Sequence, residues 1–196
     1  MRTVVVFDFD GTLTSKDSML EFIAFSKGRL QLYLGLLIFL PQLVLMKCGI
    51  LSNHAVKERF LSFYFKGMAY ADFKDLGEHF IERVLRIQRP DTIRDLNELL
   101  SNQATAYVVT ASIEEWVRPY CLTRGIKAEN VLGTQLEVDD DGRLTGRFAT
   151  PNCNDEEKVT RFLAAEPDRQ NYRLIAYGDS KGDIPMFRLA DEYMKV

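Results

Sequence analysis

Three mostly apolar runs, each followed at once by polar residues, constrain the fold of this 196-residue chain more than any other feature. They are residues 4–7 before Asp8, residues 106–109 before Thr110, and residues 172–177 before Gly178 and Asp179. Short apolar runs of this kind are typical of strands that are buried on both faces. The carboxyl ends of parallel strands meet at the edge of the sheet where ligands bind. We therefore expect the polar residues after the three strands to converge on one site.

Helical patterns separate the strands. Residues 16–89 carry apolar residues at three- and four-residue steps, with Ser52 and Asn53 placed to cap one helix and Pro90 placed to end the last. After Pro90 the pattern alternates between helix and strand, and the acidic turn at residues 139–142 predicts a hairpin. This alternation is typical of an α/β fold.

We therefore predict a doubly wound, mostly parallel, Rossmann-like core. Residues 1–15 and 90–196 are expected to build this core. Residues 16–89 are expected to form a helical domain that is inserted after the first strand.

The most apolar stretch, residues 30–46, has two interpretations. It approaches the length of a membrane span, but it contains Gln31, Gln42 and Pro41 and lies between two parts of one domain. We expect no stable membrane insertion. We predict instead a buried or substrate-covering pair of helices that is kinked or broken at Pro41.

Composition excludes some partners and compartments. Hydrophobic residues make up 46% of the chain, charged residues 27%, and the net charge is -3, so we expect no nucleic-acid partner. Cys48, Cys121 and Cys153 show no metal or disulfide spacing. The chain enters its first strand directly after Met1-Arg2-Thr3, so we expect no signal peptide and a cytoplasmic location.

Acidic residues dominate the polar ends of the strands. Asp8 and Asp10 follow the first strand, where Gly11 permits a turn that aims both carboxylates into one cleft. A carboxylate beside Mg²⁺ can attack a phosphoryl group while a second, protonated carboxyl donates a proton to the leaving oxygen. Asp179 and Asp183 supply further oxygen ligands of the kind that Mg²⁺ prefers.

Four segments in order resemble the motifs of the haloacid dehalogenase superfamily, and specifically its phosphoserine-phosphatase-like branch, subfamily IB. They are DFDGTLT, VVTAS, the lysine of NDEEKV, and GDSKGD. The resemblance spans nearly the whole chain, and the helical insertion lies where that branch carries its cap of the C1 type. It implies a magnesium-dependent phosphomonoester hydrolase that acts through a phosphoaspartyl intermediate on a small metabolite such as phosphoserine or another alcohol phosphate.

The resemblance also implies roles for individual residues. Asp8 corresponds to the nucleophile and Asp10 to the general acid and base. Phosphate binding falls to Thr110, Ala111 and Lys158, and metal binding to Asp8, Asp10, Asp179 and Asp183. Asp17 stands where phosphoserine phosphatases resemble one another in carrying a glutamate, and Arg59 is placed to match their cap arginine, so both are expected to contact substrate.

Two alternatives to a phosphatase stay open. The first is a phosphomutase or phosphotransferase of the same superfamily, which resembles this chain in having the Asp8 and Asp10 pair. The second is a non-catalytic protein that uses the apolar helical insertion to bind a membrane or a partner. Intact Asp8, Asp10 and Lys158 favour an enzyme, because a binding module needs none of them. The sequence leaves the oligomeric state open.

Overall fold

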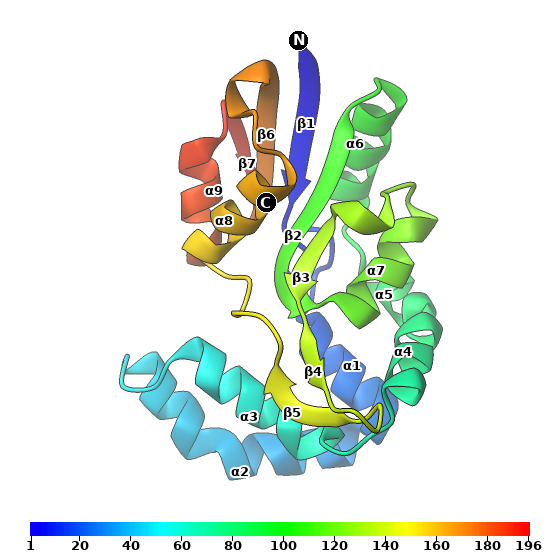
Figure 1. Ribbon diagram of the computed structural model, residues 1–196, viewed down its shortest axis with the longest axis vertical. Helices are drawn as coiled ribbons and strands as arrows, with labels where there is room; N and C mark the ends of the chain where they lie inside the picture. Colours follow the sequence, from blue (N-terminus) through cyan, green and yellow to red (C-terminus); the bar gives the residue numbers. More distant parts are fainter.

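A parallel sheet of five strands forms the centre of the molecule, and the computed structural model describes all of residues 1–196 (Figure 1). The strands, in spatial order, are β3 (Val131–Thr134), β2 (Thr105–Ile113), β1 (Arg2–Phe7), β6 (Tyr172–Gly178) and β7 (Glu192–Lys195). The predicted strands at residues 4–7, 106–109 and 172–177 are therefore adjacent and parallel. The predicted doubly wound α/β fold is confirmed.

Helices cover both faces of this sheet. They are α6 (Pro90–Ser101), α7 (Glu114–Thr123), α8 (Glu156–Ala165) and α9 (Ile184–Leu189), with short 3-10 turns at η1 (Ala128–Asn130), η2 (Arg169–Asn171) and η3 (Lys181–Asp183). Side chains alternate along a strand, so Val5 and Phe7 pack with α6 and α7 whereas Val4 and Val6 pack with α8 and α9. Both faces of β1 are buried, which explains its unbroken apolar sequence.

A helical unit lies beyond the carboxyl ends of the strands (Figure 1). It comprises α1 (Ser18–Lys27), α2 (Arg29–Lys47), α3 (Asn53–Phe65), α4 (Tyr70–His79) and α5 (Ile81–Ile87). Its centre is aromatic: Phe22 packs against Phe65, Phe73 and Phe80 of the unit and stacks on Trp116 of α7. The helical unit and the sheet therefore share one continuous hydrophobic core.

The structure corrects part of the prediction for residues 30–46, because a single helix stands where a pair was expected and it is not buried. Helix α2 passes through Pro41 without a break. Pro41 lies on the exposed side of α2, where water can satisfy the carbonyl group that loses its helical partner. The helix is also mostly exposed rather than buried, since only Leu32, Gly35 and Phe39 are fully covered.

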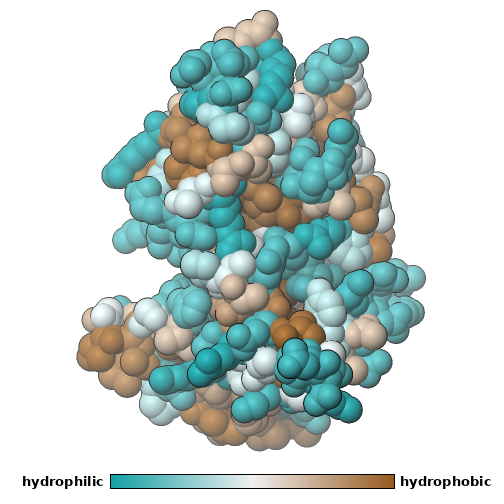
Figure 2. Space-filling model, viewed as in Figure 1, coloured by the Kyte–Doolittle hydropathy of each residue, from teal (hydrophilic) through white to brown (hydrophobic).

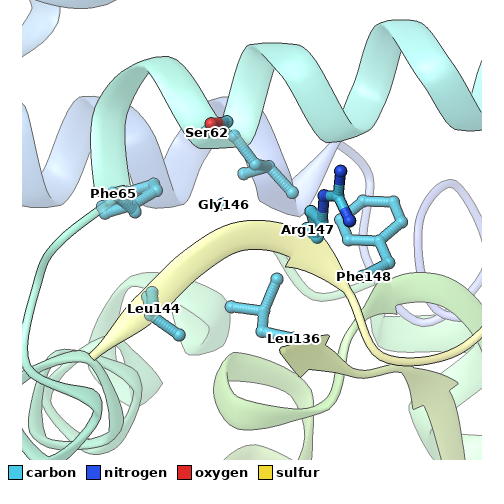
Figure 3. A pocket seen from close by; sticks show the side chains of 8 residues that line it. Ser62, Phe65, Leu136, Leu144, Gly146, Arg147 and Phe148 are labelled. Carbon is cyan, nitrogen blue, oxygen red and sulfur yellow. The ribbon is translucent and has the colours of Figure 1, made fainter. Parts of the chain in front are cut away.

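The predicted hairpin exists, but it stands apart from the main sheet. Strands β4 (Leu136–Val138) and β5 (Leu144–Phe148) form a separate sheet of two strands that packs against α3 (Figure 3). The space left between them holds about 10 Å³, roughly one water molecule. The second half of the chain thus supplies one wall of the helical unit.

Candidate active site

Asp8 is the first residue beyond β1. Its backbone N–H donates to the Tyr177 carbonyl on β6 at 3.0 Å, so the strand pairing fixes its position. The chain then turns sharply, with Leu13 and Thr14 donating back to the Phe9 carbonyl. Gly11 has φ +78° in this turn, and a Cβ atom there would lie 2.2 Å from Asp179 Oδ2. The turn therefore requires glycine where the β1 and β6 loops meet.

Asp10 is held by donors from two elements. The Ser18 N–H donates to Oδ1 at 2.7 Å, and the Ser112 hydroxyl donates to Oδ2 at 2.5 Å. Trp116 Nε1 donates to the Ser18 hydroxyl, which fixes that contact from behind. Burial, followed by the nearby charge of Asp17, raises the pKa of Asp10 to about 7 in spite of these donors. Asp10 can therefore carry or release a proton near neutral pH.

Lys158 joins the first strand to the last loop. This buried side chain on α8 lies 2.8 Å from Asp8 Oδ1 and donates to Asp183 Oδ1 at 2.6 Å. Burial alone would lower the pKa of Lys158, but the carboxylates of Asp8 and Asp183 outweigh it and raise the pKa. Burial would likewise raise the pKa of Asp183, yet Lys158 keeps it below its ordinary value. The lysine is therefore charged.

Three carboxylates cluster around this lysine. Asp8, Asp179 and Asp183 each place an oxygen within 4.8 Å of the other two. Burial and the charge of Asp183 raise the pKa of Asp179, so the cluster holds more negative charge than Lys158 balances. Such a set of oxygen donors fits a hard divalent cation.

Asp183 differs from the other two acids in its partners. Its Oδ2 accepts from the Ser180 N–H, the Ser180 hydroxyl and the Asp179 N–H, while its Oδ1 accepts from Lys158. Both oxygens are thus occupied by donors of the protein, and the residue lies behind the cleft rather than on its surface. Asp8 and Asp179 line the cleft and have the more accessible oxygens.

Thr110 and Ala111 line the cleft from β2. The Thr110 hydroxyl accepts from the Ser112 N–H at 3.1 Å. The Ala111 carbonyl accepts from Thr134 at 2.9 Å and from Lys57 Nζ of α3 at 2.7 Å. The lysine contact is a direct polar link between the helical unit and the sheet.

The cleft encloses about 670 Å³ between these charged groups and the helical unit. Apolar side chains form its wall on the side of the helical unit, namely Met19, Leu20, Leu36, Leu43, Met46, Val56 and Phe60. A ligand held here would meet the acids and Lys158 at one end, and a mostly apolar surface that also carries Asn53 and Lys57 at the other.

The two substrate contacts expected from the helical unit fare differently. Asp17 lines the cleft, where its side chain also caps α1 by accepting from the Leu20 N–H. Arg59 is exposed and does not line the cleft, whereas Lys57 does. Residues two apart on a helix point about 200° away from each other, so only one of them can face the sheet. Placing Arg59 in the site was therefore a misassignment of the helix face.

The cleft also contains residues that the sequence analysis did not assign to the site. Lys16, Asn53, Arg89 and Asn154 line it together with Lys57. Of these five residues, only Lys57 could be singled out from the sequence, because it lies off the apolar stripe of its helix. The other four follow turns or begin helices, and only the folded arrangement brings them to the cleft.

The family model for haloacid dehalogenase-like hydrolases matches residues 5–188. The chain belongs to this family. Protein CicA of Caulobacter vibrioides is 34% identical over 195 residues, which cover 96% of this chain and 83% of that protein. A histidinol-phosphatase of Neisseria meningitidis is 39% identical over 95 residues, which cover 45% of this chain and 41% of that protein.

Solved structures show the same fold. A protein of unknown function from Bordetella pertussis superimposes with a TM-score of 0.79 at 21% identity, covering 100% of this chain and 90% of that one. The phospho-aspartyl intermediate analogue of phosphoserine phosphatase superimposes with a TM-score of 0.67 at 18% identity, covering 99% of this chain and 86% of that one. The expected phosphoserine-phosphatase-like architecture is thereby confirmed.

Proposed function

We propose that this protein is a magnesium-dependent phosphomonoester hydrolase that forms a phosphoaspartate on Asp8. The observation that carries the proposal is the pairing of two neighbouring acids with different partners, since Asp8 contacts Lys158 whereas Asp10 accepts from Ser18 and Ser112. Burial raises the pKa of both acids, that of Asp10 to about 7, but only Asp8 is in contact with the charged Lys158, which acts against burial and favours the carboxylate. One group is suited to attack and the other to proton transfer.

The first step is the attack of an Asp8 carboxylate oxygen on phosphorus. A bond forms between Asp8 and phosphorus, and the bond from phosphorus to the ester oxygen breaks. Asp10 gives its proton to that oxygen, so the alcohol leaves uncharged. Lys158 and the backbone around Thr110 and Ala111 are the groups in the cleft that stabilise the charge on the transferring phosphoryl oxygens.

The second step reverses the role of Asp10. Its carboxylate takes a proton from water, whose oxygen attacks phosphorus and breaks the bond to Asp8. Inorganic phosphate leaves, and both acids return to their starting states. Ser18 and Ser112 hold Asp10 in one orientation through both steps.

We propose Asp8 and Asp179 as side-chain ligands of Mg²⁺, with the Asp10 carbonyl beside them. Asp183 would hold the loop and orient bound water. The ion supplies charge neutralisation between the attacking carboxylate and the phosphoryl oxygens, which would otherwise repel each other. The excess of carboxylates over Lys158 supports this assignment.

The substrate proposed is a small phosphomonoester with an apolar part next to the phosphate. The relatives that act on histidinol phosphate and phosphoserine support a small-molecule substrate. The apolar cleft wall favours a leaving group that is less polar than serine. Residues 16–89 would act as the cap that covers this group, with Lys57 and Asp17 as its polar contacts. The free state of all three cysteines supports a cytoplasmic location.

Phosphate release from a panel of phosphomonoesters tests the proposal. We expect release by the unchanged protein with Mg²⁺, and none by the Asp8→Asn variant or after removal of Mg²⁺. Denaturing gels after brief incubation with a ³²P-labelled substrate should show a labelled chain that Asp8→Asn lacks. Release that survives in Asp8→Asn, or transfer of the phosphoryl group to a second alcohol in place of water, would contradict the proposal.

A further inference from the structure

Helix α2 presents a broad apolar face to solvent. Figure 2 shows hydrophobic colour along the lowest part of the molecule and at its lower left tip, where α2 and the turn after it lie in Figure 1. The exposed apolar residues of α2 are Leu30, Tyr33, Leu34, Leu37, Ile38, Leu40, Val44 and Leu45. Ile50 and Phe63 extend this surface, which we call the α2 face. Large contiguous exposed apolar surfaces mark interaction sites.

The fold itself does not use this face. Leu32, Gly35 and Phe39 on the opposite side of α2 pack into the helical unit, and Leu36, Leu43 and Met46 line the cleft. The Tyr64 hydroxyl of α3 donates to the Gln31 carbonyl at 3.0 Å, which ties the two helices together. Packing within the chain therefore does not explain why the α2 face is apolar.

The charged residues of α2 and of the segments next to it in the sequence are all basic. Between Phe22 and Lys57 the sequence contains no aspartate or glutamate. Exposed cations stand at both ends of the helix, Arg29 at its start and Lys47 at its end. An apolar face with basic residues at its margins is the pattern of helices that lie in the interface of an anionic membrane.

We propose that the α2 face binds the surface of an anionic lipid bilayer, with α2 lying in the plane of the interface. By length and composition α2 could also cross a bilayer. Crossing would require α2 to leave α1 and α3, which would expose Leu32 and Phe39 and break the Tyr64 contact. Lying on the surface keeps every one of these contacts.

A second copy of the chain fits the α2 face less well. Two α2 helices packed antiparallel would bring Arg29 of one copy beside Lys47 of the other, and the stretch between Phe22 and Lys57 offers no acid to neutralise them. Phosphate groups of anionic lipids neutralise both ends at once. Charge complementarity therefore favours lipid as the occupant.

Binding in this way would place the cleft beside the membrane. Leu36, Leu43 and Met46 belong to the cleft wall and sit on the same helix as the α2 face. The inference about the membrane does not rest on the proposed catalytic function, because neither the α2 face nor its cations take part in the chemistry.

Flotation of the 196-residue chain with lipid vesicles tests the inference. We expect it to float with vesicles that contain phosphatidylglycerol and to bind phosphatidylcholine vesicles more weakly. Each basic residue near an anionic surface strengthens binding by about fivefold. The Arg29→Glu/Lys47→Glu variant should therefore bind phosphatidylglycerol vesicles at least about tenfold more weakly. Alkaline carbonate should release the bound protein, as it does for proteins at the interface.

Surface variants separate lipid binding from loss of structure. Leu34, Leu37 and Ile38 are 51%, 68% and 58% exposed, so Leu34→Gln/Leu37→Gln/Ile38→Gln should fold normally by circular dichroism but stay unbound. The matched control replaces exposed apolar residues elsewhere, as Leu85→Gln/Leu122→Gln/Met194→Gln, and should float like the unchanged protein.

Three outcomes would overturn the inference. The first is a chain that stays in solution with both kinds of vesicle. The second is a dimer in light scattering that the Leu34, Leu37 and Ile38 substitutions dissociate, which would assign the α2 face to a second copy. The third is a vesicle-bound chain that resists carbonate, which would indicate a helix that spans the bilayer.

Discussion

Lys57 and Arg59 are two residues apart on α3, but only Lys57 faces the cleft, where Nζ donates to the Ala111 carbonyl at 2.7 Å. Burial lowers the pKa of Lys57, although the nearby carboxylates of Asp10 and Asp17 act in the opposite direction. Under the proposed function this cation is available to a substrate phosphate or carboxylate. A lost charge-assisted hydrogen bond costs about 1.5 to 3 kcal/mol. We therefore expect Lys57→Met to lower kcat/KM by about 10- to 100-fold.

The matched control for this variant is Arg59→Met, which removes a cation from the opposite side of the same helix. Steady-state kinetics on the best substrate of the panel should leave kcat/KM of Arg59→Met within about twofold of the unchanged protein. Equal losses in the two variants would show that α3 matters as a whole and that Lys57 has no special contact.

The three cysteines also differ by their surroundings. Cys48 is exposed at the end of α2, whereas Cys121 and Cys153 are buried. Burial raises the pKa of both buried thiols, that of Cys153 to about 12, so neither forms the thiolate that reacts. Iodoacetamide should label the native protein at Cys48 alone, as mass spectrometry of its peptides can show. The Cys48→Ser variant should stay unlabelled until urea unfolds it. Labelling of Cys153 before unfolding would contradict this expectation, because it would mean that the face of the sheet under α8 opens in the native protein.

At the scale of elements, the contact between β5 and α3 depends on a glycine (Figure 3). Gly146 has φ +86°, and a Cβ atom there would lie 2.3 Å from Ser62 Oγ and 3.0 Å from Ser62 Cβ. We expect Gly146→Ala to lower the free energy of unfolding by about 2 to 4 kcal/mol, because backbone strain and a clash with α3 add together. Urea unfolding followed by tryptophan fluorescence measures this change.

A second glycine of the same hairpin provides the control. Gly142 has φ +72°, but a Cβ atom there would meet nothing within 4 Å. Gly142→Ala should therefore cost only the backbone strain, about 1 kcal/mol. If the two variants lower the free energy of unfolding by the same amount, the close contact between Gly146 and Ser62 of α3 is contradicted.

The elements that sequence reasoning located are those whose signal is local. Strands β1, β2 and β6 are buried on both faces, so burial itself imposes the unbroken apolar runs that reveal them. The acids of the cleft follow these strands directly, so locating a strand also located its acid. Asp8 and Asp179 reach one site because β1 and β6 are neighbours in register.

The elements that sequence reasoning misjudged depend on packing partners that are distant in the chain. An apolar helix such as α2 has the same sequence pattern whether a core or a membrane covers it, and Pro41 is tolerated because its side of the helix meets water. The hairpin of β4 and β5 has a clear turn signal, but nothing local tells which surface it will cover. Arg59 was placed by motif spacing, which does not fix the face of a helix.

For the molecule as a whole, the proposed metal site would couple the binding of a cation to stability. Asp8 and Asp179 come from opposite ends of the chain and repel each other and Asp183 across one site, where Lys158 is the only cation in direct contact. A cation that binds the folded cluster but not the unfolded chain stabilises the fold, by about 2.7 kcal/mol when its concentration is 100 times its Kd. For a chain of this length we expect Mg²⁺ at that concentration to raise the Tm by about 5 to 10 °C.

Asp179→Asn should change the melting temperature in opposite directions without and with Mg²⁺, relative to the unchanged protein. Without Mg²⁺ the variant should melt at a higher temperature than the unchanged protein, because one of the repelling carboxylates is gone. With Mg²⁺ the rise in Tm should be mostly lost, since a neutral amide is a weaker ligand than a carboxylate. Asp140→Asn, which removes an exposed acid from the hairpin turn, should keep the full rise. Calorimetry of the three proteins with and without Mg²⁺ measures these changes. If Mg²⁺ raises the Tm of Asp179→Asn as much as that of the unchanged protein, the cation binds away from Asp8 and Asp179.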